Sequence, residues 1–345
     1  MKKTIFTIAL IVTTVVAMAT THTVDNKPNA GAQFDDLQAA IDAAAAGDTI
    51  YVAGSPTNYG GITITKQLAI IGAGYKVDNQ YGLSTYTGSI TFKEGLDEFN
   101  DPVSNPSDSY ISGVKVDEGV FSQIAIKNGT GILIERCAPG RINLDDNVSV
   151  TIRNSIISNF LIESSVVNLI VQNSIIKHYV NSQNSASNVL IDHSLFHGGY
   201  LSQTKYVQFT NCIMYTTNTD GAEYCTFSNN ISIGGSTTEF LYDSNTGGSN
   251  LVATNPQFEV INNSNAFDYN NDYRLQSGSP AIGAGSDGTD IGIYGGNYPF
   301  PIGGEGEFLM AAPPKIPQIM ELNIQNATVP EDGTLNVQLK ARKQN

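Results

Sequence analysis

The sequence predicts an all-β protein built as a parallel β-helix solenoid with a short capping helix at its N-terminal end and a short C-terminal β tail. Three observations predict this fold class: a repeat of steady length, apolar residues at alternating positions within each repeat, and polar residues in a fixed turn position. Six aligned residues, called marker residues here, follow each other in steps of 18, 19, 20, 18 and 18 residues. A period this regular is typical of a solenoid. The marker residues are Cys137, Ser155, Ser174, Ser194, Cys212 and Asn230.

Each repeat carries a short strand just before its marker. Apolar residues stand five and three positions before it, as Val150 and Ile152 do before Ser155. Residues two apart share one face of a strand, so these columns are expected to face a common core. A leucine-rich repeat is the competing solenoid, but it needs a leucine frame at 20–29 residues, whereas β-branched residues fill most of these columns.

The residue immediately before the marker is asparagine in four repeats, namely Asn154, Asn173, Asn211 and Asn229, while Arg136 and His193 take this position in two others. Asparagine tolerates the left-handed backbone of tight turns. Its amide also donates and accepts hydrogen bonds. We therefore expect a turn at this position, with the asparagine side chains stacked on one another as a ladder.

The two ends of the repeat region resemble known proteins. The segment FDDLQAAIDAAAAGDTIYVAG from Phe34, followed by GITITKQLAIIGAGY from Gly61, is similar to the start of right-handed parallel β-helix proteins of the pectin-lyase-like superfamily. The stretch DYRLQSGSPAIGAG from Asp272 resembles the closing coils of exported bacterial members. The resemblance covers about residues 34–296 and implies a right-handed coil whose open N-terminal end is covered by a helix. That helix would bury Phe34, Leu37, Ile41 and Ala44 and stop at Gly47. Because the architecture hosts lyases, hydrolases, epimerases and adhesins, the resemblance implies a fold rather than a reaction.

The N-terminus predicts export. Lys2 and Lys3 precede a short apolar run, and Ala17-Met18-Ala19 forms the small-x-small pattern of a signal-peptidase site. The run is shorter than the ~20 apolar residues that a transmembrane helix needs. We expect a signal peptide at 1–19, a linker at 20–33, the parallel β-helix at 34–298, and a linker with a C-terminal β-hairpin at 299–345. The mature bacterial protein would be secreted, periplasmic or on the cell surface, with no membrane span.

Composition narrows the partners. The chain of 345 residues has 32 acidic and 18 basic residues and a formal net charge of −14. Nucleic acid is not an expected partner, because phosphate binding needs a basic surface. The three cysteines cannot form a complete disulfide framework. A polysaccharide or cell-surface glycan is the partner that the resemblance suggests, and the sequence leaves the oligomeric state open.

Two polar columns supply candidate site residues. The position two before the marker is expected to point outward, so Glu135, Arg153 and Asp192 are candidate catalytic residues there, with Gln172 and Thr210 as binding residues. Three positions past the marker, Lys177, His197 and Tyr215 could act as acid or base in β-elimination. The simpler interpretation of both columns is a set of solvated surface residues, with Glu135 and Arg153 as a surface ion pair.

One loop is a candidate calcium site, and no other cofactor is expected. Glu94, Asp97, Glu98 and Asp101 lie close together in a polar segment between the first coils. The leading functional hypothesis is an exported β-helix protein that presents a rigid acidic surface in a binding or structural role. The alternative is a polysaccharide lyase or glycoside hydrolase that uses the outer face. A hydrolase needs two carboxylates roughly 5–9.5 Å apart, but Glu135 and Asp192 are three coils apart, about 14 Å.

Overall fold

The computed structural model describes residues 19–75, 83–117, 119, 122–145, 147–162, 168–182, 188–201, 203–233, 240–241, 244–301, 318–324 and 337–342. The predicted signal peptide therefore lies, except for Ala19, outside the described residues. Within the described part of the chain, no helix is long and apolar enough to cross a membrane.

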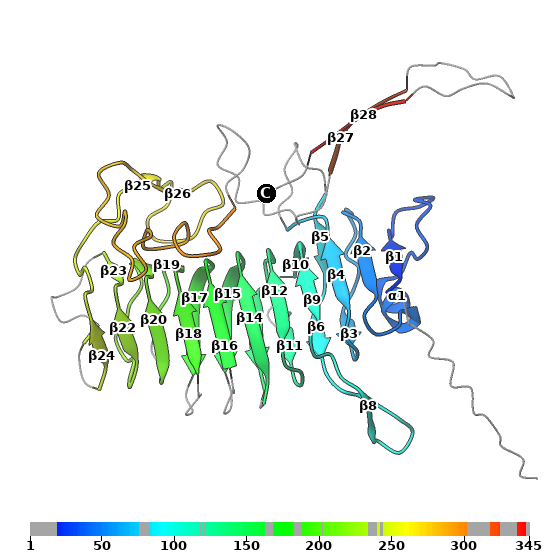
Figure 1. Ribbon diagram of the computed structural model, residues 1–345, viewed down its shortest axis with the longest axis horizontal. Coiled ribbons are helices and arrows are strands. Elements are labelled where there is room, and N and C mark those ends of the chain that lie inside the picture. The colour runs from blue at the N-terminus through cyan, green and yellow to red at the C-terminus, as the bar shows by residue number, and fades with distance from the viewer. Residues whose placement is uncertain are drawn as a thin grey trace, which may run out of the picture.

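The predicted parallel solenoid is confirmed. Its two long parallel sheets run along the whole body, and successive coils add one strand to each (Figure 1). In order, the first sheet contains β1 (Thr21–Val24), β2 (Thr49–Val52), β4 (Ala69–Gly72), β9 (Tyr110–Ser112), β12 (Ile132–Glu135), β14 (Ser149–Arg153), β16 (Asn168–Gln172), β18 (Val189–Asp192), β20 (Val207–Thr210), β22 (Thr226–Ser228) and β24 (Thr246–Gly248). The second contains β3 (Ile62–Ile64), β6 (Ile90–Phe92), β11 (Ile124–Ile126), β13 (Arg141–Leu144), β15 (Ile156–Ile162), β17 (Ile175–Ser182), β19 (Leu195–His197), β21 (Ile213–Tyr215) and β23 (Ile231–Ser232). A third, two-stranded parallel sheet belongs to the early coils and consists of β5 (Thr85–Thr87) and β10 (Val114–Val116).

The core follows the two apolar columns. β14 and β16 pair in parallel, so Val150 lies beside Leu169 and Ile152 beside Val171. These four side chains are at most 2% exposed. Near the C-terminal end, Phe209 and Phe227 occupy the same column and stack with ring centroids 4.8 Å apart. Apolar neighbours thus stack along the axis, a packing that suits the β-branched and aromatic residues in these positions.

The N-terminal end is covered by α1 (Leu37–Ala43), as predicted, but the helix is shorter than expected: Phe34 precedes it in a bridge to Val24, and the helix ends at its C-cap Ala44 instead of at Gly47. Asp36 caps the helix by accepting the N–H of Ala39, and Leu37, Ala40 and Ile41 are buried against the first coil. The prediction that residues 20–33 form a linker is wrong, because β1 lies within this range and pairs with β2 along its full length. A four-residue strand outside the repeat is too short for periodicity to reveal.

The turn before each marker residue is left-handed, as expected: Asn154, Asn173, Asn211, Asn229, His193 and Arg136 all have φ between 43° and 56°. The expected asparagine stack is wrong, however. The amide nitrogen of Asn154 donates to the carbonyl of Tyr298, and that of Asn173 donates to the carbonyls of Ile293 and Gly295. These asparagines bond to a distant part of the chain rather than to one another.

The ladder lies one residue later, in the marker column itself. The serine and asparagine side chains here accept the backbone N–H of the marker residue in the preceding coil, whereas the thiols of Cys137 and Cys212 donate to backbone carbonyls. Each serine hydroxyl also donates to the carbonyl two residues before it. The bonds run from the N–H of Cys137 to Ser155, of Ser155 to Ser174, of Ser174 to Ser194, of Cys212 to Asn230 and of Asn230 to Asn250. The buried N–H groups at these five corners are thereby satisfied.

The last part of the predicted β-helix, residues 255–298, does not continue the coil. Thr254 is the last residue whose N–H bonds to the preceding coil, and Pro256, which has no N–H, follows two residues later. The chain then forms the antiparallel pair β25 (Phe258–Val260) and β26 (Asp272–Leu275) and folds back along one side of the solenoid (Figure 1). We call residues 255–300 the C-terminal strap.

Two antiparallel hairpins complete the structure. β7 (Gly95–Leu96) and β8 (Pro102–Ser104) form a hairpin that projects from the body. β27 (Gln318–Ile324) and β28 (Val337–Arg342) form the predicted C-terminal hairpin.

Replacing Ser174 tests the ladder. The Ser174→Ala variant would leave the buried N–H of Ser155 without its acceptor, which is 3.2 Å away in the wild type. We expect it to lower the free energy of unfolding by roughly 1–3 kcal/mol. Gln172→Ala, two residues away on the outer face, is the control and is expected to cost less than ~0.5 kcal/mol. Urea denaturation of both variants measures the difference; an equal or larger loss at Gln172 would contradict the ladder.

Candidate functional site

The outward column exists as predicted but is not a solvated face. Glu135, Arg153, Gln172, Asp192 and Thr210 are register partners on successive strands. The interpretation of Glu135 and Arg153 as a surface ion pair is wrong. Glu135 is only 8% exposed and accepts a hydrogen bond from the Tyr110 hydroxyl at 2.8 Å. The guanidinium of Arg153 instead lies over the ring of Tyr298 in the strap, 4.1 Å from its centroid.

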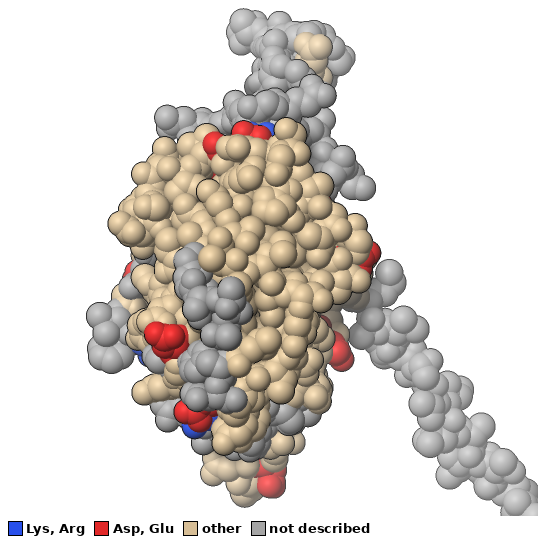
Figure 2. Space-filling view, turned by 90° about the vertical axis from the view of Figure 1, so that its left-hand side faces the viewer, with Lys and Arg blue, Asp and Glu red and all other residues tan. Residues whose placement is uncertain are grey.

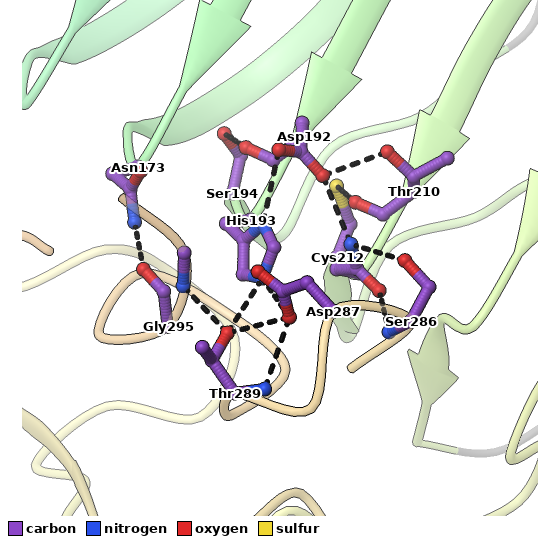
Figure 3. A network of polar contacts seen from close by, with 12 residues as sticks. Asn173, Asp192, His193, Ser194, Thr210, Cys212, Ser286, Asp287, Thr289 and Gly295 are labelled. Atoms are coloured by element: carbon purple, nitrogen blue, oxygen red, sulfur yellow. Dashed lines mark hydrogen bonds and ion pairs between the residues drawn. The ribbon is translucent and has the colours of Figure 1, made fainter. Parts of the chain in front are cut away.

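Asp192 is held by its neighbours on two coils (Figure 3). Its Oδ1 accepts hydrogen bonds from the Thr210 hydroxyl at 2.7 Å and from the Asn211 amide at 3.1 Å. Its Oδ2 lies 3.0 Å from Nδ1 of His193, an ion-pair contact in which Nδ1 makes no well-aligned hydrogen bond. Burial alone raises the pKa of Asp192, but the contacts with His193, Thr210 and Asn211 together hold that pKa below its usual value.

His193 connects the solenoid to the strap. On its other side, Nε2 lies 3.2 Å from the Thr289 hydroxyl and 3.6 Å from a carboxylate oxygen of Asp287. The strap approaches closely: a Cβ on Gly295 would lie 2.7 Å from the imidazole ring of His193. With the Asn173 and Asn211 contacts drawn in Figure 3, this network fastens the strap onto the left-handed turns. The column around Asp192 therefore has a structural explanation.

The second predicted column is brought together only in part. His197 and Tyr215 are register partners whose rings meet edge to face, 4.9 Å apart. His197 is fully buried, and its Nδ1 bonds to the hydroxyl of Tyr273 in the strap. Burial lowers the pKa of His197 and raises that of Tyr215. The pairing of β17 with β19 ends at Ile176, so Lys177 does not join His197 and Tyr215 in this register, and its ammonium lies 5.5 Å from the ring centroid of Phe267. The interpretation of this column as solvated residues is wrong for His197.

The carboxylates of the acidic loop, where we expected a calcium site, are not gathered at one point among the described residues. Its residues lie on and around the β7–β8 hairpin, where Asp97 accepts the backbone N–H groups of Phe99 and Asp101. Glu94 accepts a hydrogen bond from the Asn128 amide instead. Among the residues that the structure describes, no three His, Cys, Asp or Glu side chains are grouped so that they could hold a metal ion.

The structure contains a pocket that the sequence did not indicate. It has a volume of about 400 Å³, and its walls include Tyr75, Tyr86, Tyr269, Lys115, Ser55 and Ser84. We call it the tyrosine pocket. Most of its residues come from the early coils, outside the regular repeat, and Tyr269 comes from the strap. The repeat pattern of the sequence cannot indicate a site that is assembled from such separate segments.

The walls of the tyrosine pocket are well fixed. Tyr86 and Lys115 are register partners on β5 and β10, and the Lys115 ammonium lies 5.8 Å from the Tyr86 ring centroid. The backbone carbonyl of Ser84 accepts the N–H of Ser55 at 3.0 Å. The Ser84 side chain is 4% exposed, and its hydroxyl has no hydrogen-bond partner among the described residues. A buried hydroxyl without a partner is uncommon, and this one belongs to a residue that lines the pocket.

No protein-family model matches this chain, and no curated protein matches it.

Acid titration tests the role of Asp192. The pKa of Asp192 is lower in the folded than in the unfolded protein. Its contribution to the stability of the fold is therefore complete at pH values above the unfolded pKa of about 3.9, and it is lost as the pH falls through the folded pKa. At pH 6 we expect Asp192→Asn to reduce the free energy of unfolding by roughly 1.5–3 kcal/mol. The difference from wild type should shrink below about pH 4. Urea denaturation across pH measures it, with exposed Asp220→Asn as the control. A difference that does not change with pH would contradict this role.

Proposed function

We propose that the protein is an exported carbohydrate-binding protein whose ligand site is the tyrosine pocket. The observation that carries this proposal is the combination of tyrosine walls with the buried hydroxyl of Ser84, which has no hydrogen-bond partner within the described part of the chain. A sugar ring has apolar C–H faces and a rim of hydroxyl groups. It therefore needs aromatic surface together with a few fixed polar groups, which is the general composition of small-molecule sites.

The geometry supports binding without large rearrangement. Tyr86 and Lys115 sit on paired strands rather than on loops, and the Thr85 hydroxyl, next to Tyr86, donates to the carbonyl of Val52 in the preceding coil. A site whose side chains are already fixed loses less conformational entropy when a ligand binds. The solenoid thus acts as a rigid support for the pocket, in line with the expected binding role.

The acidic surface of the leading hypothesis is a weaker argument than the pocket. The end of the molecule that carries β24 is mostly uncharged, with a few separated acidic residues (Figure 2). On this face, the negative charge of the chain is not gathered into a patch. We therefore rest the proposed function on the pocket and not on net charge.

The alternative of a lyase or hydrolase on the outer face has less support. Glu135 and Asp192 are engaged by neighbouring side chains, and His197 is buried beneath the strap. A general acid or base must come within hydrogen-bond reach of the substrate proton. Assays for reducing ends and unsaturated products on a polysaccharide panel test this alternative directly.

Export is supported by the start of the fold. β1 begins at Thr21, two residues past Ala19, the last residue of the predicted signal peptide. The backbone nitrogen of Thr20 donates to the carboxylate of Asp48 at 2.7 Å, and Asp48 is 3% exposed. After cleavage at Ala19 that nitrogen would be a charged α-amino group facing a buried carboxylate.

The proposal also includes the handedness and the family of the fold. From the resemblance of the entry segment and the closing segment, we propose that the solenoid is right-handed and belongs to the pectin-lyase-like superfamily.

Glycan binding tests the pocket. We expect Tyr86→Ala and Tyr269→Ala each to weaken binding of the best oligosaccharide from a neutral and acidic panel by roughly tenfold or more, because each removes one aromatic wall. Tyr206→Ala is the matched control, since Tyr206 is 43% exposed and stacks on Tyr224 outside the pocket. Isothermal titration calorimetry measures the affinities. Absence of binding in the wild type, or equal loss in the control, would contradict the proposal.

The mature N-terminus tests export. Sequencing of the exported protein should begin within a few residues of Thr20. In that mature protein, Asp48→Asn should lower the free energy of unfolding by roughly 1.5–3 kcal/mol, because it removes a charge-assisted hydrogen bond. Exposed Asp35→Asn should change it by less than ~0.5 kcal/mol. A folded product that retains Met1 outside the cytoplasm would contradict this part of the proposal.

A further inference from the structure

A second pocket lies where the second sheet is irregular. The pairing of β15 with β17 matches Ile157 to Ile176 and then Asn159 to Tyr179. One residue, Ser158, is therefore opposite two, Lys177 and His178, which is the arrangement of a β-bulge. Bulges redirect side chains and are frequent beside functional sites. This one places two neighbouring basic residues on the same stretch of surface.

Arg141 joins these residues from the adjacent coil. Arg141, on β13, is the register partner of Asn159 on β15. These two residues line a pocket of about 280 Å³, whose walls also include Ser122, Ser158, Lys177 and His178. We call it the bulge pocket. It shares no lining residue with the tyrosine pocket. Its basic side chains stand out in a chain whose net charge is −14.

Two groups of the bulge pocket lack partners. The half-buried guanidinium of Arg141 makes no hydrogen bond or ion pair within the described residues. The Oδ1 atom of Asn159 is buried and likewise has no partner there. A guanidinium presents a planar fork of donors that matches two oxygens of an anion. The carbonyl oxygen of Asn159 can accept a hydrogen bond from a hydroxyl beside that anion.

We propose that the bulge pocket binds a phosphate or sulfate ester. Arg141, Lys177 and His178 supply positive charge or donors, and the hydroxyls of Ser122 and Ser158 supply further donors. A tetrahedral anion has enough acceptor oxygens for all of these groups. The carrier of the ester would place a hydroxyl near Asn159. This site is independent of the proposed glycan binding in the tyrosine pocket.

Titration of the full mature chain with inorganic phosphate and with inorganic sulfate tests the proposal. We expect saturable binding of at least one of them, weakened by about tenfold or more in Arg141→Gln, because a charged donor is lost. Arg141→Lys keeps the positive charge but not the planar fork of donors, so its affinity should lie between those of the wild type and Arg141→Gln. Lys205→Gln is the control, since Lys205 is paired with Glu223 elsewhere on the solenoid, 2.9 Å away. Its affinity should equal that of the wild type.

The comparison of the two anions identifies the ester type, and acetate tests the need for a tetrahedral group. No saturable binding of phosphate or sulfate by the wild type would overturn the proposal. Equal weakening in Lys205→Gln would also overturn it, because the attraction would then be general. Acetate binding as tight as that of phosphate and sulfate would do the same. Thermal melts show whether Arg141→Gln is folded; if it is not, Arg141→Lys decides the question.

Discussion

The structure depends on how each coil satisfies its backbone at the corner between the two long sheets. A left-handed residue turns the chain there, so the next N–H points along the solenoid axis and needs an acceptor in the following coil. Ser155, Ser174, Ser194, Asn230 and Asn250 supply that acceptor from their side chains. A one-residue slip would remove the acceptor and turn the apolar columns outward, so both effects select the same register.

The same turn determines what covers the outer face. The marker side chains form hydrogen bonds within the solenoid, whereas the side chains one position before them face the strap. They form hydrogen bonds to it from Asn154, Asn173, His193 and Asn211. The strap in turn brings Tyr269 to the tyrosine pocket and Phe267 against Lys177 of the bulge pocket. The rings of Phe267 and Tyr269 meet edge to face, 4.9 Å apart. One segment therefore lines the tyrosine pocket and contacts a residue of the bulge pocket, while it covers the column that the sequence made the leading candidate.

The repeat made the coils, the inward columns and the left-handed turns predictable, and the resemblance of the entry segment made the capping helix predictable. It misplaced the ladder by one residue because asparagine suits both the turn and a stack, and spacing alone does not show which way a side chain points. The strap could not be anticipated, because its contacts join residues such as Asn173 and Gly295 that are far apart in sequence and follow no period. The tyrosine pocket was missed for the same reason, since Tyr75, Tyr86, Lys115 and Tyr269 belong to segments with no repeat in common.

The irregular step that creates the bulge pocket is visible in the sequence. From Ser155 to Ser174 the step is 19 residues, and from Ser174 to Ser194 it is 20. Asn159 stands four residues past its marker, whereas its partner Tyr179 stands five past Ser174, and Ile157 and Ile176 each stand two past theirs. The additional residue must therefore lie between Ile176 and Tyr179, where the chain has Lys177 and His178. In a solenoid held by a strict register, an extra residue cannot join the ladder and its side chain is turned to a new direction. Departures from the period are thus the places where a regular scaffold can carry chemistry that its columns cannot.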